Sequence, residues 1–280
     1  MRTPQAGSTI VITGASSGIG RAAAAALSAA GASVAVVGRD PGRTAAVAES
    51  VGGRPFVTDF DHLDRVRELA DALLSAFASI DVLANNAGGI VTARQRTADG
   101  HDRIIQSNHL APFLLTRLLL PRLTESGGRV ISTASNTNLI ARLDLDDLDY
   151  DRGPWLGGWR AYGTSKLATI LFIRELARRT AGTGVDAYAV HPGYVASGFG
   201  GDIGLLRFAQ TISGGRLGHS NEEGAQPLVA LASAAEPGAP SGTYFSRLRP
   251  DGRQSRRAFD ERLAKDLWAK SSELVGLPAD

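Results

Sequence analysis

Short apolar runs alternate along the chain with longer stretches rich in Ala and Leu. The runs rich in Val, Ile and Thr predict seven strands, at residues 9–13, 33–37, 54–58, 81–85, 128–134, 185–190 and 243–246. Helical periodicity predicts helices over residues 18–30, 40–50, 62–77, 99–123, 161–180 and 221–234. Pro112 is expected to divide the fourth of these stretches into two helices. Strands that alternate with helices indicate an α/β protein with a doubly wound parallel sheet and helices on both faces.

The chain shows no linker or internal repeat, so a single domain over residues 1–280 is expected. Two irregular stretches, residues 136–160 and 193–218, are longer than ordinary connections and are candidate substrate-site loops. The first is rich in Asp, which suits either a solvated loop or an edge that contacts a substrate or partner. The second carries Phe, Ile and Leu among glycines, which suits either a lid over a lipophilic substrate or a packed amphipathic helix.

Composition excludes several classes of protein. There is no cysteine, which rules out disulfides and thiolate chemistry, and the five His residues show no metal-ligand spacing, so no metal is expected. Thirty basic residues against 28 acidic ones give a net charge of +2, which does not indicate a nucleic-acid partner. No stretch fits a signal peptide or membrane anchor, so a cytoplasmic protein is expected.

A glycine-rich turn follows the first predicted strand. Residues 13–20 read TGASSGIG and lead directly into an Ala-rich helix. Glycines at such a junction allow a sharp turn and close approach of a pyrophosphate, which the helix N-terminus attracts. The sequence therefore predicts a dinucleotide-binding turn, although a tight glycine turn of any α/β protein would also fit this spacing. The candidate cofactor contacts here are Gly14, Ser16, Ser17, Gly18, Ile19 and Gly20.

Tyr162 and Lys166 lie four residues apart in a predicted helix, so their side chains share one face. A phenol with a pKa of about 10 is a poor acid at neutral pH. A neighbouring ammonium would lower that pKa and favour proton transfer. Such pairs are common on helix surfaces, but lysine is rare here, since of 30 basic residues only Lys166, Lys265 and Lys270 are Lys.

Four motifs in order resemble those of the short-chain dehydrogenase/reductase family. They are TGASSGIG, Asn85-Asn86-Ala87-Gly88, the Tyr-x-x-x-Lys of Tyr162 and Lys166, and Pro192-Gly193. Residues 107–123, 161–179, 190–195 and 241–277 resemble the retinol-dehydrogenase-like branch of that family. The resemblance covers essentially the whole chain. It implies a Rossmann fold and an enzyme that transfers hydride between a nicotinamide and a carbonyl or alcohol.

The resemblance also implies a catalytic tetrad of Asn108, Ser135, Tyr162 and Lys166. Tyr162 would be the proton donor or acceptor, and Ser135 would hold the reacting oxygen. Asn108 would support a water chain to Lys166, which would also bind the nicotinamide ribose. Ser132 competes with Ser135 for its role but lies three positions too early when the strand is matched to the family.

The end of the second predicted strand bears on the choice of cofactor. An acidic residue there would favour NAD, whereas this chain has Arg39, whose guanidinium suits a 2′-phosphate. NADP(H) is therefore preferred, and NAD(H) stays open because Asp40 follows and could neutralise Arg39. By resemblance, the remaining cofactor contacts are Asp59, Phe60, Asn86, Ala87, Gly88, Tyr162, Lys166, Pro192, Gly193, Val195 and Ser197.

The expected partner is a small carbonyl or alcohol of lipophilic character. Residues 113–120 and 167–177 are apolar nearly all round and match the helices that pair subunits in the family, so a homodimer or homotetramer is expected. The alternative function is a non-catalytic NADP-binding sensor, because a fold alone does not determine an activity. Such a sensor would be expected to lack part of the tetrad, and no member is missing here.

Overall fold

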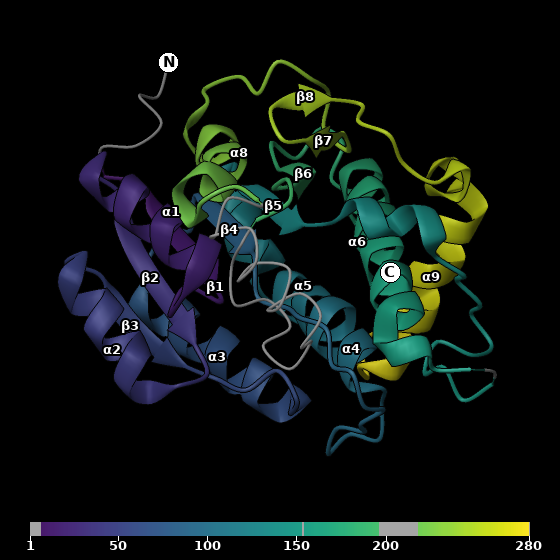
Figure 1. Ribbon diagram of the computed structural model, residues 1–280. Coiled ribbons are helices and arrows are strands. Elements are labelled where there is room, and N and C mark those ends of the chain that lie inside the picture. The colour runs from purple at the N-terminus through teal and green to yellow at the C-terminus, as the bar shows by residue number, and fades with distance from the viewer. Residues whose placement is uncertain (1–6, 153, 196–217, 280) are drawn as a thin grey trace.

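A central sheet of eight strands organises the protein (Figure 1). The computed structural model describes residues 7–152, 154–195 and 218–279. The strand order is β3-β2-β1-β4-β5-β6-β7-β8. The strands are β1 (Thr9–Thr13), β2 (Ser33–Gly38), β3 (Arg54–Val57), β4 (Val82–Asn85), β5 (Arg129–Thr133), β6 (Asp186–His191), β7 (Tyr244–Ser246) and β8 (Arg249–Pro250).

The first seven strands are parallel, which confirms the predicted sheet. The eighth strand, β8, was not predicted; it runs antiparallel to β7 and has only two residues, too few for an apolar run. The winding direction reverses between β1 and β4, which are adjacent in the sheet. In doubly wound sheets a ligand crevice forms beyond the carboxyl ends of the strands at such a reversal.

Helices cover both faces of the sheet, as predicted (Figure 1). Within the described ranges, no helix is both long and apolar enough to cross a membrane. The longer helices are α1 (Gly18–Ala29), α2 (Pro41–Ser50), α3 (Leu63–Ala76), α5 (Ala111–Ser126), α6 (Trp159–Arg179), α8 (Asn221–Ser233) and α9 (Glu261–Leu274). Short helical segments are α4 (Arg103–Ile105), η1 (Gln106–Leu110), η2 (Asn136–Ile140), η3 (Leu156–Gly158) and η4 (Arg256–Phe259).

The two faces of the sheet each have a hydrophobic core. Ile10 and Ile12 of β1 pack with residues of α1, α2 and α8, whereas Val11 between them packs with residues of α3, α5 and α6. Side chains alternate in direction along a strand, so a strand that is covered on both faces must be apolar at every position. This explains why the predicted strands are continuous apolar runs rather than alternating ones.

The chain stays helical through Pro112, so the expected division takes the form of a changed hydrogen-bond pattern. α4 passes into the π-helical segment η1, which passes into α5, and the backbone is helical at both junctions. Proline has no N–H to bond the carbonyl of Asn108 four residues earlier. A π-helical turn is a common feature of functional sites, and Asn108 lies within this one.

The helix α9 was not predicted, and it packs along α6 (Figure 1). Its Trp268 is 3% exposed and lies against Phe113 of α5 and Phe172 of α6, with ring centroids 5.0 and 5.9 Å away. The chain itself therefore covers the apolar surfaces of α5 and α6 that led us to expect an oligomer. The homodimer or homotetramer stays a prediction, and the apolar surfaces of α5 and α6 no longer support it.

The acid-rich stretch, residues 136–160, is held in place by its own carboxylates. Asp149 accepts a hydrogen bond from the backbone N–H of Asp102 at 2.7 Å and lies 3.3 Å from Nδ1 of His101. Arg96 forms ion pairs with Asp149 and Asp151. Aspartates of this loop therefore anchor it to the segment before α4, which neither of the two expected roles included.

The second candidate loop, residues 193–218, is described only at its two ends. Residues 196–217 lie outside the described residues, and with them Ser197 and the apolar side chains of the expected lid.

Candidate active site

The predicted site residues gather beyond the carboxyl ends of the parallel strands, at one edge of the sheet. In order after β1 to β6 come Gly14, Arg39, Asp59, Asn86, Ser135 and Pro192. Residues far apart in the sequence therefore meet around the point where the winding reverses. Tyr162 and Lys166 reach this edge from the first turns of α6.

The glycine-rich turn has the geometry of a phosphate-binding cradle. Gly14 and Gly18 have φ values of +67° and +54°, the left-handed region that favours glycine. A Cβ on Gly20 would lie 2.3 Å from the carbonyl oxygen of Gly14, so only glycine allows α1 to approach the turn. Ser17, the N-cap of α1, makes no capping hydrogen bond through its side chain. The N–H groups of the first helical turn therefore suit the pyrophosphate of a dinucleotide.

Arg39 is exposed immediately after β2. Asp40, which could have neutralised it, caps α2 instead: its Oδ1 accepts a hydrogen bond from the Arg43 N–H at 2.8 Å. Oδ2 of Asp40 lies 3.5 Å from Nε of Arg43. The Asp61 carboxylate pairs with Arg103 at 2.7 Å, and no described carboxylate forms an ion pair with Arg39. The Arg39 guanidinium is therefore well placed to meet a phosphate.

The segment after β4 joins three strand ends. Thr13 Oγ1 accepts hydrogen bonds from the backbone N–H groups of Asn86 and Ala87, both at 3.0 Å. The side chain of Asn86 donates to the Thr13 carbonyl at 3.1 Å and accepts from Thr133 Oγ1 at 3.4 Å. These bonds fix the ends of β1, β4 and β5 relative to one another. Sequence reasoning missed Thr13, whose role depends on contacts across the sheet.

The other expected cofactor contacts differ in burial and in what they contact. Asp59 is half-buried, and its Oδ1 accepts the Asp61 N–H at 3.1 Å. The Phe60 side chain is buried in the core, so only its backbone can face a ligand. Gly193 has a φ of +92°, whereas Val195 packs closely on Gly224 of α8.

Tyr162 and Ser135 come together at the centre of this edge. Tyr162 is 6% exposed, and burial raises the pKa of its phenol, while a hydrogen bond with Ser135 lowers the pKa by a smaller amount. The Nζ atom of Lys166 lies 5.3 Å from the Tyr162 ring centroid and donates to the Thr133 carbonyl at 2.9 Å. Burial lowers the pKa of Lys166 to about 8.

That Lys166 lowers the pKa of Tyr162 stays a prediction; for the protein alone the net shift of this pKa is upward, because burial outweighs the hydrogen bond with Ser135. The phenol is consequently protonated at neutral pH, the state in which it can donate a proton. Lys166, with a pKa of about 8, is mostly charged under the same conditions.

Asn108 is held beside Lys166 by a pair of hydrogen bonds. Its Oδ1 accepts the Gly89 N–H and its Nδ2 donates to the Gly89 carbonyl, both at 2.8 Å. A Cβ on Gly88 would lie 2.1 Å from Asn108 Oδ1 and 3.5 Å from Lys166 Nζ. Gly88 therefore provides the space in which these two side chains approach each other.

The geometry favours Ser135 over Ser132. Ser132 is 2% exposed, and its Oγ accepts a hydrogen bond from Asn85 Nδ2 at 3.4 Å inside the core. Ser135 lies beyond the end of β5 and its hydroxyl reaches Tyr162.

Sequence reasoning also missed Trp159, the first residue of α6. Its ring centroid lies 6.5 Å from that of Tyr162, and the two ring planes are 87° apart. The signal was present in the sequence, because a residue three positions before Tyr162 on a helix lies on the same face.

Known proteins resemble this chain along nearly its full length. The sequence model of the family described as short chain dehydrogenase matches residues 8–144. The protein named "Putative daunorubicin C-13 ketoreductase DnrU", from Streptomyces sp. (strain C5), is 43% identical over 96% of this chain and 93% of the relative. The chain therefore belongs to the short-chain dehydrogenase/reductase family of enzymes.

Within that family the chain is similar to the retinol dehydrogenases. Retinol dehydrogenase 13 of Homo sapiens is 35% identical over 98% of this chain and 86% of the relative. Among solved structures, a protein from Mycobacterium paratuberculosis matches with a TM-score of 0.80 and 34% identity, covering 98% of this chain and 96% of its own. The Pseudomonas aeruginosa RhlG/NADP complex matches with a TM-score of 0.70 and 28% identity, covering 88% and 97%.

Proposed function

We propose that the protein is an NADP(H)-dependent oxidoreductase that acts on a lipophilic carbonyl or alcohol, with Tyr162 as the proton donor or acceptor. The observation that carries the proposal is the convergence of Ser135, Tyr162 and Lys166 beside a turn suited to a dinucleotide. The proton-bearing phenol and the phosphate cradle lie at the same edge of one sheet, as a reaction between cofactor and substrate requires.

A nicotinamide cofactor, when bound, would be the source of the hydride for the carbonyl carbon. The hydroxyl groups of Ser135 and Tyr162 hold the carbonyl oxygen, which gains negative charge as the carbon is reduced. The proton of Tyr162 passes to that oxygen, so one ketone, one NADPH and one proton yield one alcohol and one NADP⁺. The charge of Lys166, close to the phenol ring, stabilises the phenolate until it is protonated again. Oxidation of an alcohol reverses these proton transfers.

Two observations support NADP(H) over NAD(H). Arg39 forms no close ion pair within the described residues, because Asp40 pairs with Arg43 and the nearby Asp61 pairs with Arg103. The RhlG complex, which has a similar fold, was solved with NADP. Titration with each reduced cofactor tests the choice: we expect NADPH to bind more tightly, and tighter binding of NADH would refute it.

A lipophilic substrate is supported by apolar side chains at the rim of the site. Leu139, Ile140 and Leu156 are 40%, 54% and 59% exposed, and they belong to the segments that follow Ser135 and precede Tyr162. Two similar proteins are named as a ketoreductase and a retinol dehydrogenase, names that refer to carbonyl and alcohol substrates.

The decisive experiment compares Tyr162→Phe with the wild type across a panel of lipophilic ketones and alcohols. The variant keeps the buried ring but loses the transferable proton, so turnover should fall by about 10²- to 10⁴-fold while NADPH binding persists. Wild-type-like turnover in this variant would refute the mechanism. Cofactor binding without any wild-type turnover would favour the sensor instead.

Two serine variants test the placement of the substrate oxygen. Ser135→Ala should lower turnover, because Ser135 reaches the phenol, whereas Ser132→Ala is the matched control whose hydroxyl faces Asn85 in the core. The reverse ranking would assign the role to Ser132.

A further inference from the structure

An exposed tryptophan stands beside the reactive phenol. Trp159 lies one helical turn before Tyr162, and 37% of it is exposed, a large share for a Trp next to a buried active-site residue. The rings of Trp159 and Tyr162 meet edge to face, with planes 87° apart. This contact fixes the orientation of the indole ring while part of its surface stays open.

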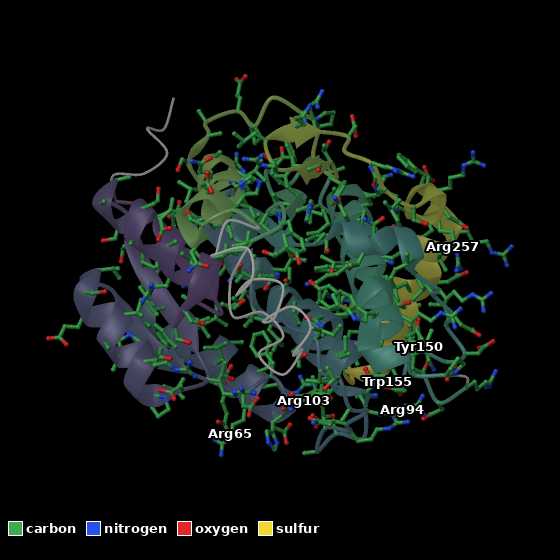
Figure 2. All side chains as sticks on the ribbon, in the orientation of Figure 1. Arg65, Arg94, Arg103, Tyr150, Trp155 and Arg257 are labelled. Atoms are coloured by element: carbon green, nitrogen blue, oxygen red, sulfur yellow. The ribbon has the colours of Figure 1, made fainter. Side chains whose placement is uncertain are left out.

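Among the described residues, buried apolar side chains pack on part of the Tyr162 side chain. Ile90 and Ile104 form a buried cluster with Tyr162, against which Trp155 packs. Trp155 is itself held by a hydrogen bond to the Thr92 carbonyl at 2.7 Å, and the guanidinium of Arg94 lies 5.3 Å from its ring. Figure 2 labels Trp155 and Arg94 at the lower right of the molecule. Trp159, by contrast, contacts the Tyr162 ring and is partly exposed, so a substrate at the phenol can also meet its indole.

The backbone before Trp159 is equally well fixed. Gly158 has a φ of +78°, and a Cβ there would lie 2.4 Å from the Val91 carbonyl oxygen and 3.0 Å from Ile104. The start of α6 is thus pressed against the segment that follows β4. Trp159 is a rigid part of the rim rather than a side chain on a loose loop.

Apolar surface continues from Trp159 around the site. Ile140 is 54% exposed, and its Cγ1 would lie 3.2 Å from a Cβ on Gly163, the residue after Tyr162. Leu156, which precedes Trp159 in the chain, is 59% exposed. Trp159 is the aromatic member of these three open side chains, so it can contribute a preference for flat rings.

We propose that Trp159 determines substrate specificity by selecting carbonyl compounds that carry a flat aromatic or conjugated ring next to the reacting carbon. Offset or edge-to-face contacts between aromatic rings stabilise more than the burial of the same area alone. A saturated ring of similar size gains the burial but not the ring contact. The proposal rests on the proposed function, because it concerns the substrate of the same site.

A matched pair of ketones tests the proposal. Acetophenone and cyclohexyl methyl ketone share the methyl carbonyl group and ring size but differ in aromaticity. We expect wild-type kcat/KM to be higher for acetophenone. Trp159→Ala should lower the acetophenone-to-cyclohexyl ratio about five- to tenfold, mainly through KM, whereas Trp159→Phe should keep most of the ratio.

An exposed aromatic residue elsewhere provides the control. Phe259 on η4 is 57% exposed and packs on Arg174, so Phe259→Ala should leave the ratio of the two ketones unchanged. Thermal unfolding and NADPH binding of each variant report whether the fold and the cofactor site are intact.

The outcomes separate the two proposals. If the wild type reduces both ketones and Trp159→Ala leaves their ratio unchanged, the specificity role is overturned and the proposed function stands. If Trp159→Ala and Trp159→Phe lose both activities equally, Trp159 only positions Tyr162, which also overturns the specificity role. If the wild type turns over other members of the panel but neither of these ketones, the specificity role alone is overturned; absence of turnover across the whole panel counts against the proposed function.

Discussion

Replacing Trp268 by Ala removes the side chain that holds α9 against the rest of the protein. The indole packs between Phe113 and Phe172, and the guanidinium carbons of Arg117 and Arg179 lie 4.9 and 4.5 Å from its ring centre. Removing a buried Trp costs about 3–5 kcal/mol of the free energy of unfolding. Two cations over the ring add to the aromatic contacts, so we expect a value at the upper end of that range.

Urea unfolding followed by circular dichroism measures this loss. Trp159→Ala is the matched control, because that indole is 37% exposed against 3% for Trp268 and its removal should cost much less. Loosening α9 also uncovers Phe113 and Phe172, so Trp268→Ala should self-associate more than the wild type in sedimentation experiments. Equal losses of stability in the two variants, without added self-association, would refute the role that we assign to Trp268.

Two further predictions concern Gly88 and His109. Gly88→Ala should displace Asn108, because the new Cβ would lie 2.1 Å from Asn108 Oδ1 at a φ of +155°. We expect turnover to fall by about 10²-fold, and Gly89→Ala, where a Cβ meets nothing within 4 Å, is the control that should remain active. Burial lowers the pKa of His109 to about 4, so the unfolded chain takes up a proton below pH 6.5 that the folded chain resists. The stability present above pH 6.5 is therefore lost as the pH falls to about 4, by about 3 kcal/mol from this residue, and unfolding of His109→Gln by urea should show a correspondingly smaller loss; an unchanged pH dependence would contradict this account.

The sheet could be predicted from sequence because burial on both faces leaves a direct trace in composition. β1 is apolar at Ile10, Val11 and Ile12, and β2 and β4 are likewise buried runs, whereas the edge strand β3 is mostly exposed. The placement of Asn108 and Ser135 depended instead on family resemblance. No local pattern distinguishes Ser135 from Ser132; the fold does, because Ser132 is buried within β5 and Ser135 lies beyond its end.

Other features depend on contacts that sequence spacing does not encode. The apolar positions of α9 include Leu263, Leu267 and Trp268 among charged residues. This helix is stabilised mainly by tertiary packing of its apolar face, which sequence spacing alone does not reveal. The distance between Tyr162 and Lys166 followed from their spacing on a helix. The upward shift of the Tyr162 pKa did not follow from the spacing, because it depends on how completely the rest of the fold excludes water from the phenol.

The packing of α9 on α5 and α6 also affects folding during synthesis. The ribosome makes α5 and α6 well before α9, so Phe113 and Phe172 leave the exit tunnel without the helix that later covers them. Until α9 is made, the nascent chain exposes the apolar surface around these two side chains. We therefore expect a chain that includes α9 to aggregate less than one that ends before it, because α9 covers these two rings.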